Sequence, residues 1–423
     1  MANGSSINFI DAPGLIKIER TSESAFGMEV WCHQVSKFLG KKNGLRTFHA
    51  ANRDESMWLN KYIISKIKTT GPISVDEYTK EALTNPRGGY YITQDSIGEK
   101  GDFTTSPEVS QMFGELVGVW FLNEWNKIGQ PKPLQVIELG AGRGTLMDDM
   151  LRVFKKVPDY ENNISVHIVE VSEKLRKEQK RKLGYNRRLE LSKYKVPIKW
   201  YSSLDEVPKA FSFIVANEFF DALPINKFHK QDGEWYEMLV DVDNLDRFRY
   251  VLFKTLKRRL IDKDESRNHV EICTEGGVMV QKMAARIKEK GGLALIIDYG
   301  HQGTKEDTFR AFRRHKLADP LVNPGTCDLT ADVDFKYLTK CVADHALVYG
   351  PVTQSSFLKN MGIQLRLERL LRNAPQDSRE QLISGYHQLV DEDKMGSRFK
   401  VMALYPPVLT DLLKTCPPAG FSK

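Results

Sequence analysis

The residues with the most chemical content lie between positions 134 and 151, in the stretch LQVIELGAGRGTLMDDML. Gly140, Gly142 and Gly144 follow an apolar run that ends near Glu138. Glycines let the backbone approach a ligand closely, and the start of a helix offers free N–H groups. The pattern predicts a strand, a ligand-binding loop and a helix, although a tight turn without a ligand would use the same glycines.

The acid before the loop separates two classes of ligand. Dinucleotide sites favour the pattern G-x-G-x-x-G, and here the sixth position is Thr145. A carboxylate at Glu138 would repel a pyrophosphate, whereas it suits S-adenosylmethionine, which carries a sulfonium and an ammonium and no phosphate. Glu170 ends the next apolar run, where an acid can accept hydrogen bonds from ribose hydroxyls. The sequence therefore favours a class I methyltransferase over a dehydrogenase.

A third apolar run ends in ANEFFDALP, which contains Asn217, Glu218 and Asp221. Carboxylates do not transfer methyl groups, but they hold and orient a cationic nucleophile such as a guanidinium, whose flat fork matches them. The spacing predicts that Glu218 and Asp221 face one side and clamp the acceptor. Alternatively, one of them caps a following helix. His301, after a fourth apolar run, fits a base or a substrate contact, and fits a structural role equally well.

Strand-like runs alternate with helix-like segments from Leu134 onward, which predicts an α/β fold with a parallel, doubly wound sheet. Asp232-Gly233 predicts a hairpin turn within an antiparallel insertion. Two late runs, ALVYGPVTQ and FKVMALYP, are expected to close the sheet as an antiparallel pair. The expected organisation is a flexible leader with a targeting function left open (1–56), an N-terminal helical region (57–130), a methyltransferase core (131–407) with insertions at about 226–276, 301–330 and 356–395, and a tail (408–423).

Composition bears on whether the protein spans a membrane, contains disulfides, binds a metal or binds nucleic acid. The chain has 423 residues, a net charge of +7 and no window near the ~18–20 apolar residues of a membrane span. Its five cysteines are scattered and odd in number, so a complete disulfide framework is excluded and no zinc spacing is present. We therefore expect no metal. The segment 174–195 has ten basic and two acidic residues, but its aromatic residues are sparse, which favours a solvated surface over a nucleic-acid face.

The N-terminus gives mixed signals about location. The first 29 residues carry Asp11, Glu19, Glu23 and Glu29, which is wrong for a mitochondrial transit peptide. The segment 30–53 has no acidic residue and several lysines and arginines, as transit peptides do.

Several ordered motifs resemble the MidA-like family over about Trp58 to Pro407. They include GEKGDFTTSPEVSQMFGELVGVW, VIELGAGRGTL, VEVSEKL, ANEFFDALP and DYGHQGTKEDTFRAFRRHK. The resemblance implies a class I methyltransferase fold with S-adenosylmethionine as the donor. It also implies that Gly101, Asp102 and Thr104 form a lid over the donor.

The mitochondrial members of that family imply more about function. They methylate an arginine, by symmetric dimethylation, on a core subunit of respiratory complex I in the matrix and support assembly of the complex. Two alternatives remain open for this chain. The first is a non-catalytic assembly chaperone that keeps the fold, and the second is a methyltransferase that acts on RNA or a small molecule.

Overall fold

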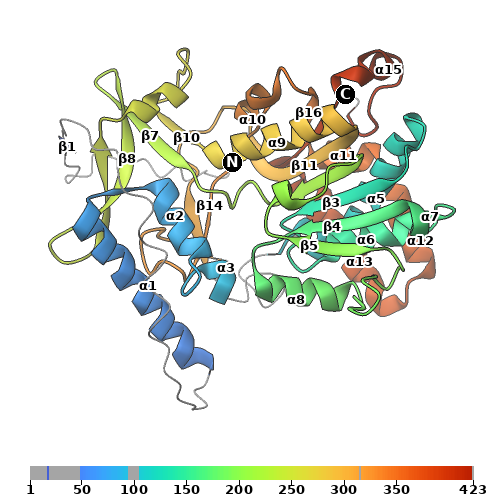
Figure 1. The fold of residues 1–423 in the computed structure, drawn as a ribbon, viewed down its shortest axis with the longest axis horizontal. Coiled ribbons are helices and arrows are strands. Elements are labelled where there is room, and N and C mark those ends of the chain that lie inside the picture. The colour runs from blue at the N-terminus through green and yellow to red at the C-terminus, as the bar shows by residue number, and fades with distance from the viewer. Residues whose placement is uncertain (1–16, 19–47, 94–103, 314–315, 422–423) are drawn as a thin grey trace.

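A computed structural model describes residues 17–18, 48–93, 104–313 and 316–421 of the chain. Its centre is a mixed sheet with strand order β16-β17-β11-β6-β3-β4-β5, to which the short β15 adds beside β11 (Figure 1). The strands are β3 (Leu134–Leu139), β4 (Ile164–Val169), β5 (Ile198–Tyr201), β6 (Ser212–Asn217), β11 (Gly292–His301), β15 (Val333–Asp334), β16 (Leu347–Thr353) and β17 (Phe399–Tyr405).

The strands of this sheet form because their side chains alternate between two buried faces. In β6, Phe213 and Val215 pack into one core cluster, while Ile214 and Ala216 pack into the other. Helices α5 and α6 and the helices after residue 353 contribute to the first cluster, and α9 and α10 contribute to the second. The predicted doubly wound α/β architecture is therefore confirmed.

The four strands predicted around the site are all present, and they pair in parallel in the order β4, β3, β6, β11. The two late runs form β16 and β17, which are antiparallel to each other, and β17 is also antiparallel to β11. The last strand of the chain therefore lies inside the sheet. Strand β5 was not predicted, because only four residues, Ile198 to Tyr201, form it and one of them is exposed.

The predicted insertion after β6 forms a second sheet, with order β1-β9-β8-β7-β10. Its strands are β1 (Lys17–Ile18), β2 (Ile73–Ser74), β7 (Asn226–Gln231), β8 (Glu234–Val242), β9 (Phe248–Phe253) and β10 (His269–Ile272). The predicted hairpin joins β7 to β8, and both of its turn residues have positive φ, 53° for Asp232 and 80° for Gly233. A left-handed pair of this kind is the turn that Asp-Gly favours.

The predicted N-terminal helical region divides between two parts of the molecule. Helix α1 (Phe48–Thr70) begins within the segment predicted as a leader. With α2 (Val75–Thr84) it packs against the inserted sheet, where Leu59, Ile63 and Tyr78 share a core with Val240. Helix α5 (Gln111–Lys127) instead packs on the central sheet. Figure 1 shows α1 and α2 in blue beside the inserted sheet, away from α5.

Shorter elements complete the fold. The 301–330 insertion contributes a three-stranded sheet of β12 (Arg310–Arg313), β13 (Lys316–Ala318) and β14 (Asp328–Thr330). The remaining α-helices are α3 (Tyr90–Thr93), α4 (Ser106–Val109), α6 (Thr145–Phe154), α7 (Tyr160–Asn163), α8 (Glu173–Lys182), α9 (Thr274–Lys290), α10 (Phe335–Val342), α11 (Gln354–Asn360), α12 (Ile363–Asn373), α13 (Gln376–Val390), α14 (Met395–Arg398) and α15 (Thr410–Thr415). Among the described residues, none of the helices has the length and apolar character needed to cross a bilayer.

The C-terminal residues pack against α5. The indole Nε1 of Trp120 donates to the carbonyl of Ala419 at 2.9 Å, and the N–H of Ala419 donates to Glu124 at 3.1 Å. The ring of Phe421 lies 6.3 Å from that of Trp120. The segment expected to be a tail thus closes one side of the core as far as Phe421.

We predict that removing residues 417–423 lowers the free energy of unfolding by about 3 kcal/mol. The deletion leaves the buried Trp120 indole without its acceptor and uncovers aromatic surface. Urea unfolding of the truncated and intact chains measures the difference. Val408→Ala is the control, because Val408 is 86% exposed; equal stability of the truncated and intact chains would contradict the prediction.

Candidate functional site

A cavity opens at the carboxyl ends of β3, β4 and β6, and it encloses about 960 Å³ of empty space, counting its open mouth. Five residues predicted from the sequence line it, namely Glu138, Gly140, Gly142, Glu170 and Glu218. Three strands that are separate in the sequence therefore bring their predicted ligand contacts to one place.

The glycine loop connects β3 to α6. Gly140 and Gly142 have φ angles of 65° and 50°, which side chains with a Cβ rarely adopt. A Cβ on Gly140 would lie 2.8 Å from the ring of Phe219, so the loop also needs glycine for space. Gly144 is not among the described residues that line the cavity; it has a φ of 84° and forms the N-cap of α6.

Glu138 supplies a buried acid at the bottom of this cavity. Its side chain is 3% exposed, and its Oε2 atom has no hydrogen-bond partner among the residues that the structure describes. Burial, together with the charge of Glu170, raises the pKa of Glu138 to about 8. An acid that lacks a partner here can be stabilised in its charged form by a cationic ligand group.

Glu170, one residue after β4, has well-defined partners. Its Oε1 accepts the N–H of Ser172 at 2.9 Å, and its Oε2 accepts Nε2 of Gln179 at 3.2 Å. Burial raises the pKa of Glu170, while these two donors act in the opposite direction. The carboxylate is therefore held in one orientation beside the cavity.

The segment before α5 covers part of the cavity. Thr105, Pro107 and Glu108 line it, and the hydroxyl of Thr145 donates to Glu108. Thr104, predicted as a lid residue, is exposed and lies next to Thr105. The other two predicted lid residues, Gly101 and Asp102, lie outside the described residues.

The third strand places its two acids in different surroundings. Glu218 lines the cavity, and its Oε1 accepts the N–H of Ser106 at 2.7 Å. Asp221 accepts hydrogen bonds from Tyr299 and Thr330 and is not among the described cavity-lining residues. Glu218 has a φ of 50°, so the residues form a left-handed turn instead of a helix start, and the two carboxylates do not share one open face.

His301 is the last residue of β11 and pairs with Asp334 of β15. It is not among the described residues that line the cavity, and its Nδ1 accepts the N–H groups of Gly303 and Thr304 at 3.0 and 3.1 Å. Burial lowers the pKa of His301, consistent with a neutral ring that accepts at Nδ1. This geometry supports the structural alternative for His301.

Three further residues of the site were missed in the sequence. Gln179 lies in a segment interpreted as a basic solvated helix. Tyr91, which lines the cavity, ends the family-like motif TTGPISVDEYTKEALTNPRGGYY, but no role was predicted for it. No role was predicted for Asp298, near the end of β11, but its Oδ2 accepts the N–H groups of Phe219, Phe220 and Asp221. The sequence signal for Asp298 was an acid at the end of an apolar strand. This signal is not specific, because acids at such positions also cap turns and helices far from any ligand.

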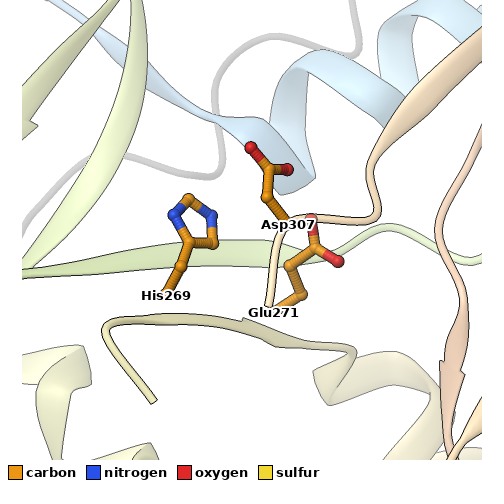
Figure 2. Close-up of side chains that lie close together, drawn as sticks. All are labelled: His269, Glu271 and Asp307. Atoms are coloured by element: carbon orange, nitrogen blue, oxygen red, sulfur yellow. The ribbon is translucent and has the colours of Figure 1, made fainter. Parts of the chain in front are cut away.

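One group of side chains in the described part of the chain has the arrangement of metal ligands (Figure 2). Atoms of His269, Glu271 and Asp307 lie within 4.8 Å of one another, in the inserted sheet and the loop after β11. However, the ammonium of Lys227 already lies 2.7 Å from Asp307 and 3.7 Å from Glu271. The lysine supplies the positive charge that these acids need, so this cluster does not fit a cation site well.

The strand order, with β17 reversed inside the sheet, and the cavity at the glycine loop define a class I S-adenosylmethionine-dependent methyltransferase. Residues 116–352 match the family of S-adenosyl-L-methionine-dependent methyltransferases. S-adenosylmethionine is accordingly the cofactor. The unpartnered Glu138 carboxylate and the glycine loop fit its ammonium group and its close approach to the backbone.

Whole-chain comparison identifies the family more closely. The chain is 50% identical to "protein arginine methyltransferase NDUFAF7, mitochondrial" of Xenopus tropicalis, over 86% of this chain and 89% of the relative. It is 48% identical to the human protein of that name, over 82% and 83% of the two chains. The chain belongs to this family of methyltransferases, and the relatives' names assign it to the mitochondrion.

Among solved structures, a Burkholderia thailandensis protein crystallised with S-adenosyl-homocysteine superposes with a TM-score of 0.70. The two chains are 24% identical, and the match covers 88% of this chain and 94% of the other. At this identity the comparison establishes the common fold.

We predict that Gly142→Val reduces affinity for S-adenosylmethionine about 100-fold while the protein remains folded. Valine is strained at a φ of 50°, and its branched side chain would enter the cavity. Isothermal titration calorimetry measures the affinity. Gly129→Val is the matched control, since Gly129 also has a positive φ, 83°, but a Cβ there would point into open space. Unchanged affinity in a folded Gly142→Val protein would exclude this loop from the donor site.

We predict that donor affinity rises between pH 6 and pH 8 and that binding releases a proton. The pKa of Glu138 is about 8 in the free protein, so its carboxyl is largely protonated below that pH. A bound ammonium favours the charged form and lowers this pKa, so binding is stronger where the carboxyl has already lost its proton. Calorimetry in buffers of different ionisation enthalpy counts the released proton. Glu138→Gln should flatten the pH dependence, and a pH-independent wild type would contradict the assignment.

Proposed function

We propose that this protein transfers methyl groups from S-adenosylmethionine to an arginine side chain of another protein. The observation that carries the proposal is the carboxylate of Glu218, which lies in the wall of the donor cavity. A cavity that binds a methyl donor and exposes an acid on the acceptor side suits a cationic acceptor. The names of the relatives, which specify arginine, support the same acceptor.

In this proposal the donor is held by residues of the first two strands. Glu138 would bind the ammonium group, Glu170 the ribose hydroxyls, and the backbone of Gly140 and Gly142 would lie against the ligand. Arg143 also lines the cavity and would meet the donor's carboxylate, although it already pairs with Glu178 at 3.2 Å. The donor supplies a methyl group on a sulfonium, which leaves as a neutral thioether.

The acceptor side is proposed to depend on charge. Burial and the charge of Asp221 raise the pKa of Glu218 to about 8, so a cation bound beside Glu218 would stabilise its charged form. Here Glu218 makes the direct contact with the guanidinium and Asp221 adds negative charge behind it. Holding one edge of the guanidinium leaves another nitrogen facing the methyl group, which is the alignment that direct displacement requires.

The proposed substrate is a core subunit of respiratory complex I, in the mitochondrial matrix, with symmetric dimethylation as the product. The resemblance to the MidA-like family motivates this choice. Mass spectrometry of complex I subunits from cells with and without the protein tests it. Loss of arginine dimethylation on one subunit is the expected result. Unchanged methylation with defective assembly would instead favour the non-catalytic chaperone, and label transferred to RNA would favour an RNA methyltransferase.

We predict that Glu218→Gln lowers the rate of methyl transfer about 100-fold, comparable to the loss of one preorganised electrostatic contact. The variant keeps the shape of the side chain and its hydrogen bond from Ser106, but removes the charge. Asp221→Asn should lower the rate less, because Asp221 is proposed to add negative charge near Glu218 without contacting the guanidinium. Transfer of labelled methyl to the partner protein is measured together with donor affinity, which should stay within about threefold.

Full activity in both variants would reject the role of these acids in acceptor binding. If methyl transfer and donor affinity fall by the same factor, the two acids contribute to binding of S-adenosylmethionine instead. Asp243→Asn is a suitable control, because that acid lies in a hairpin of the inserted sheet and pairs with Arg247.

We predict that transfer proceeds without a metal ion. Displacement from a sulfonium produces a neutral leaving group, so it needs no Lewis acid, and the best-arranged ligand cluster already contains Lys227. Activity and donor affinity are measured before and after dialysis against a chelator. Activity that disappears and returns with a divalent ion would contradict the prediction.

A further inference from the structure

Gln179 links the residues that follow β3 and β4 at the S-adenosylmethionine cavity. It lies in α8 and is completely buried, the only buried residue of that helix. Its Nε2 donates to the carbonyl of Gly142 at 2.8 Å and to Oε2 of Glu170 at 3.2 Å. Its Oε1 accepts the indole N–H of Trp200 at 2.9 Å. One side chain thus contacts both the glycine loop and the acid after β4.

The orientation of this amide is determined by its partners. An indole N–H can only donate, so the amide oxygen must face Trp200. The NH₂ group then faces the Gly142 carbonyl and the Glu170 carboxylate. A carbonyl oxygen and a charged carboxylate accept hydrogen bonds and cannot donate them. Both amide hydrogens have an acceptor, and no alternative placement of Gln179 satisfies all three partners.

The partners of Glu170 leave little freedom for its carboxylate. Ser172 donates to one oxygen and Gln179 to the other, and Glu170 lines the cavity. Without the Gln179 amide, Oε2 of Glu170 and the carbonyl oxygen of Gly142 would each lose a hydrogen bond. Both lost hydrogen bonds belong to residues that line the S-adenosylmethionine cavity. Gln179 itself is not among the described residues that line it.

We infer that Gln179 is a positioning residue that orients Glu170 and the Gly142 loop and thereby sets the preference of the site for a ribose-containing donor. This inference rests on the proposed contact between Glu170 and the ribose hydroxyls. Gln179 acts through Glu170, so its removal should affect ligands with a 2′-hydroxyl more than ligands that lack it.

The test uses Gln179→Met, which preserves the approximate length and volume of the side chain but cannot donate. Affinities for S-adenosylhomocysteine and its 2′-deoxy analogue are measured by calorimetry. We expect the affinity for S-adenosylhomocysteine to fall about tenfold, which is the worth of a hydrogen bond to a charged group. The affinity for the analogue should fall less, so that the preference for ribose decreases at least about threefold.

Gln179→Glu gives a second readout that a purely structural role would not produce. At pH 8 its carboxylate would lie against the carboxylate of Glu170 and repel it. At pH 6 the same side chain, when protonated, can again donate one hydrogen bond. We therefore expect donor affinity of this variant, relative to wild type at the same pH, to recover as the pH falls.

Gln135→Met is the matched control. Gln135 is also a buried glutamine, but it lies at the start of β3, where it accepts from Ser212 and Arg286. This variant should lower the melting temperature without changing the preference for ribose.

The inference is overturned if Gln179→Met binds both ligands as wild type does, or loses affinity for both by the same factor. Glu170→Ala, measured in the same series, separates this failure from failure of the proposed donor site. If Glu170→Ala keeps the full preference for ribose, then Glu170 does not contact the 2′-hydroxyl and the donor assignment itself is wrong.

Discussion

Asp298 extends from β11 toward the turn after β6, where its Oδ2 accepts the N–H groups of Phe219, Phe220 and Asp221 at 3.1, 3.0 and 3.3 Å. These three donors follow directly after a residue with a φ of 50°, so the turn has no helical or sheet partners for them. Buried N–H groups without acceptors are costly, and one carboxylate satisfies all three. The direction of Glu218, the position of Phe219 against Gly140 and the edge of the cavity all depend on this contact.

The central fold could be read from the sequence because its signals are local. The apolar runs ending at Leu139, Val169 and Asn217 alternate between two cores, and Asp232-Gly233 leaves few options for the chain but a hairpin. The assignment of α1 and α2 to the inserted sheet could not be read in this way. It depends on packing such as that of Tyr78 in one core cluster with Val240 of β8, which lies far away in the chain.

The parts of the site that lie at the ends of strands could be predicted from the sequence, and the parts that depend on tertiary contacts could not. Glu138 lies near the end of β3, and the glycine loop and Glu170 directly follow β3 and β4, so the sheet alone brings them together. Glu218 and Asp221 were expected on one face because spacing was the only guide, and the positive φ of Glu218 separates them. Gln179 was hidden among lysines and arginines, where a single buried amide cannot be distinguished from a solvated one without the tertiary structure.

The location of β17 affects how this protein reaches its folded state. The strand Phe399–Tyr405 pairs with β11 on one side and β16 on the other, and both partners precede it in the chain. Until that strand is in place, β11 has an unpaired edge on the side away from β6, and such edges pair readily with other chains. The central sheet is therefore complete only after residues 399–405 have joined it, and the long sequence separation of these contacts makes that step slow. A chaperone that covers apolar strand edges would protect this interval.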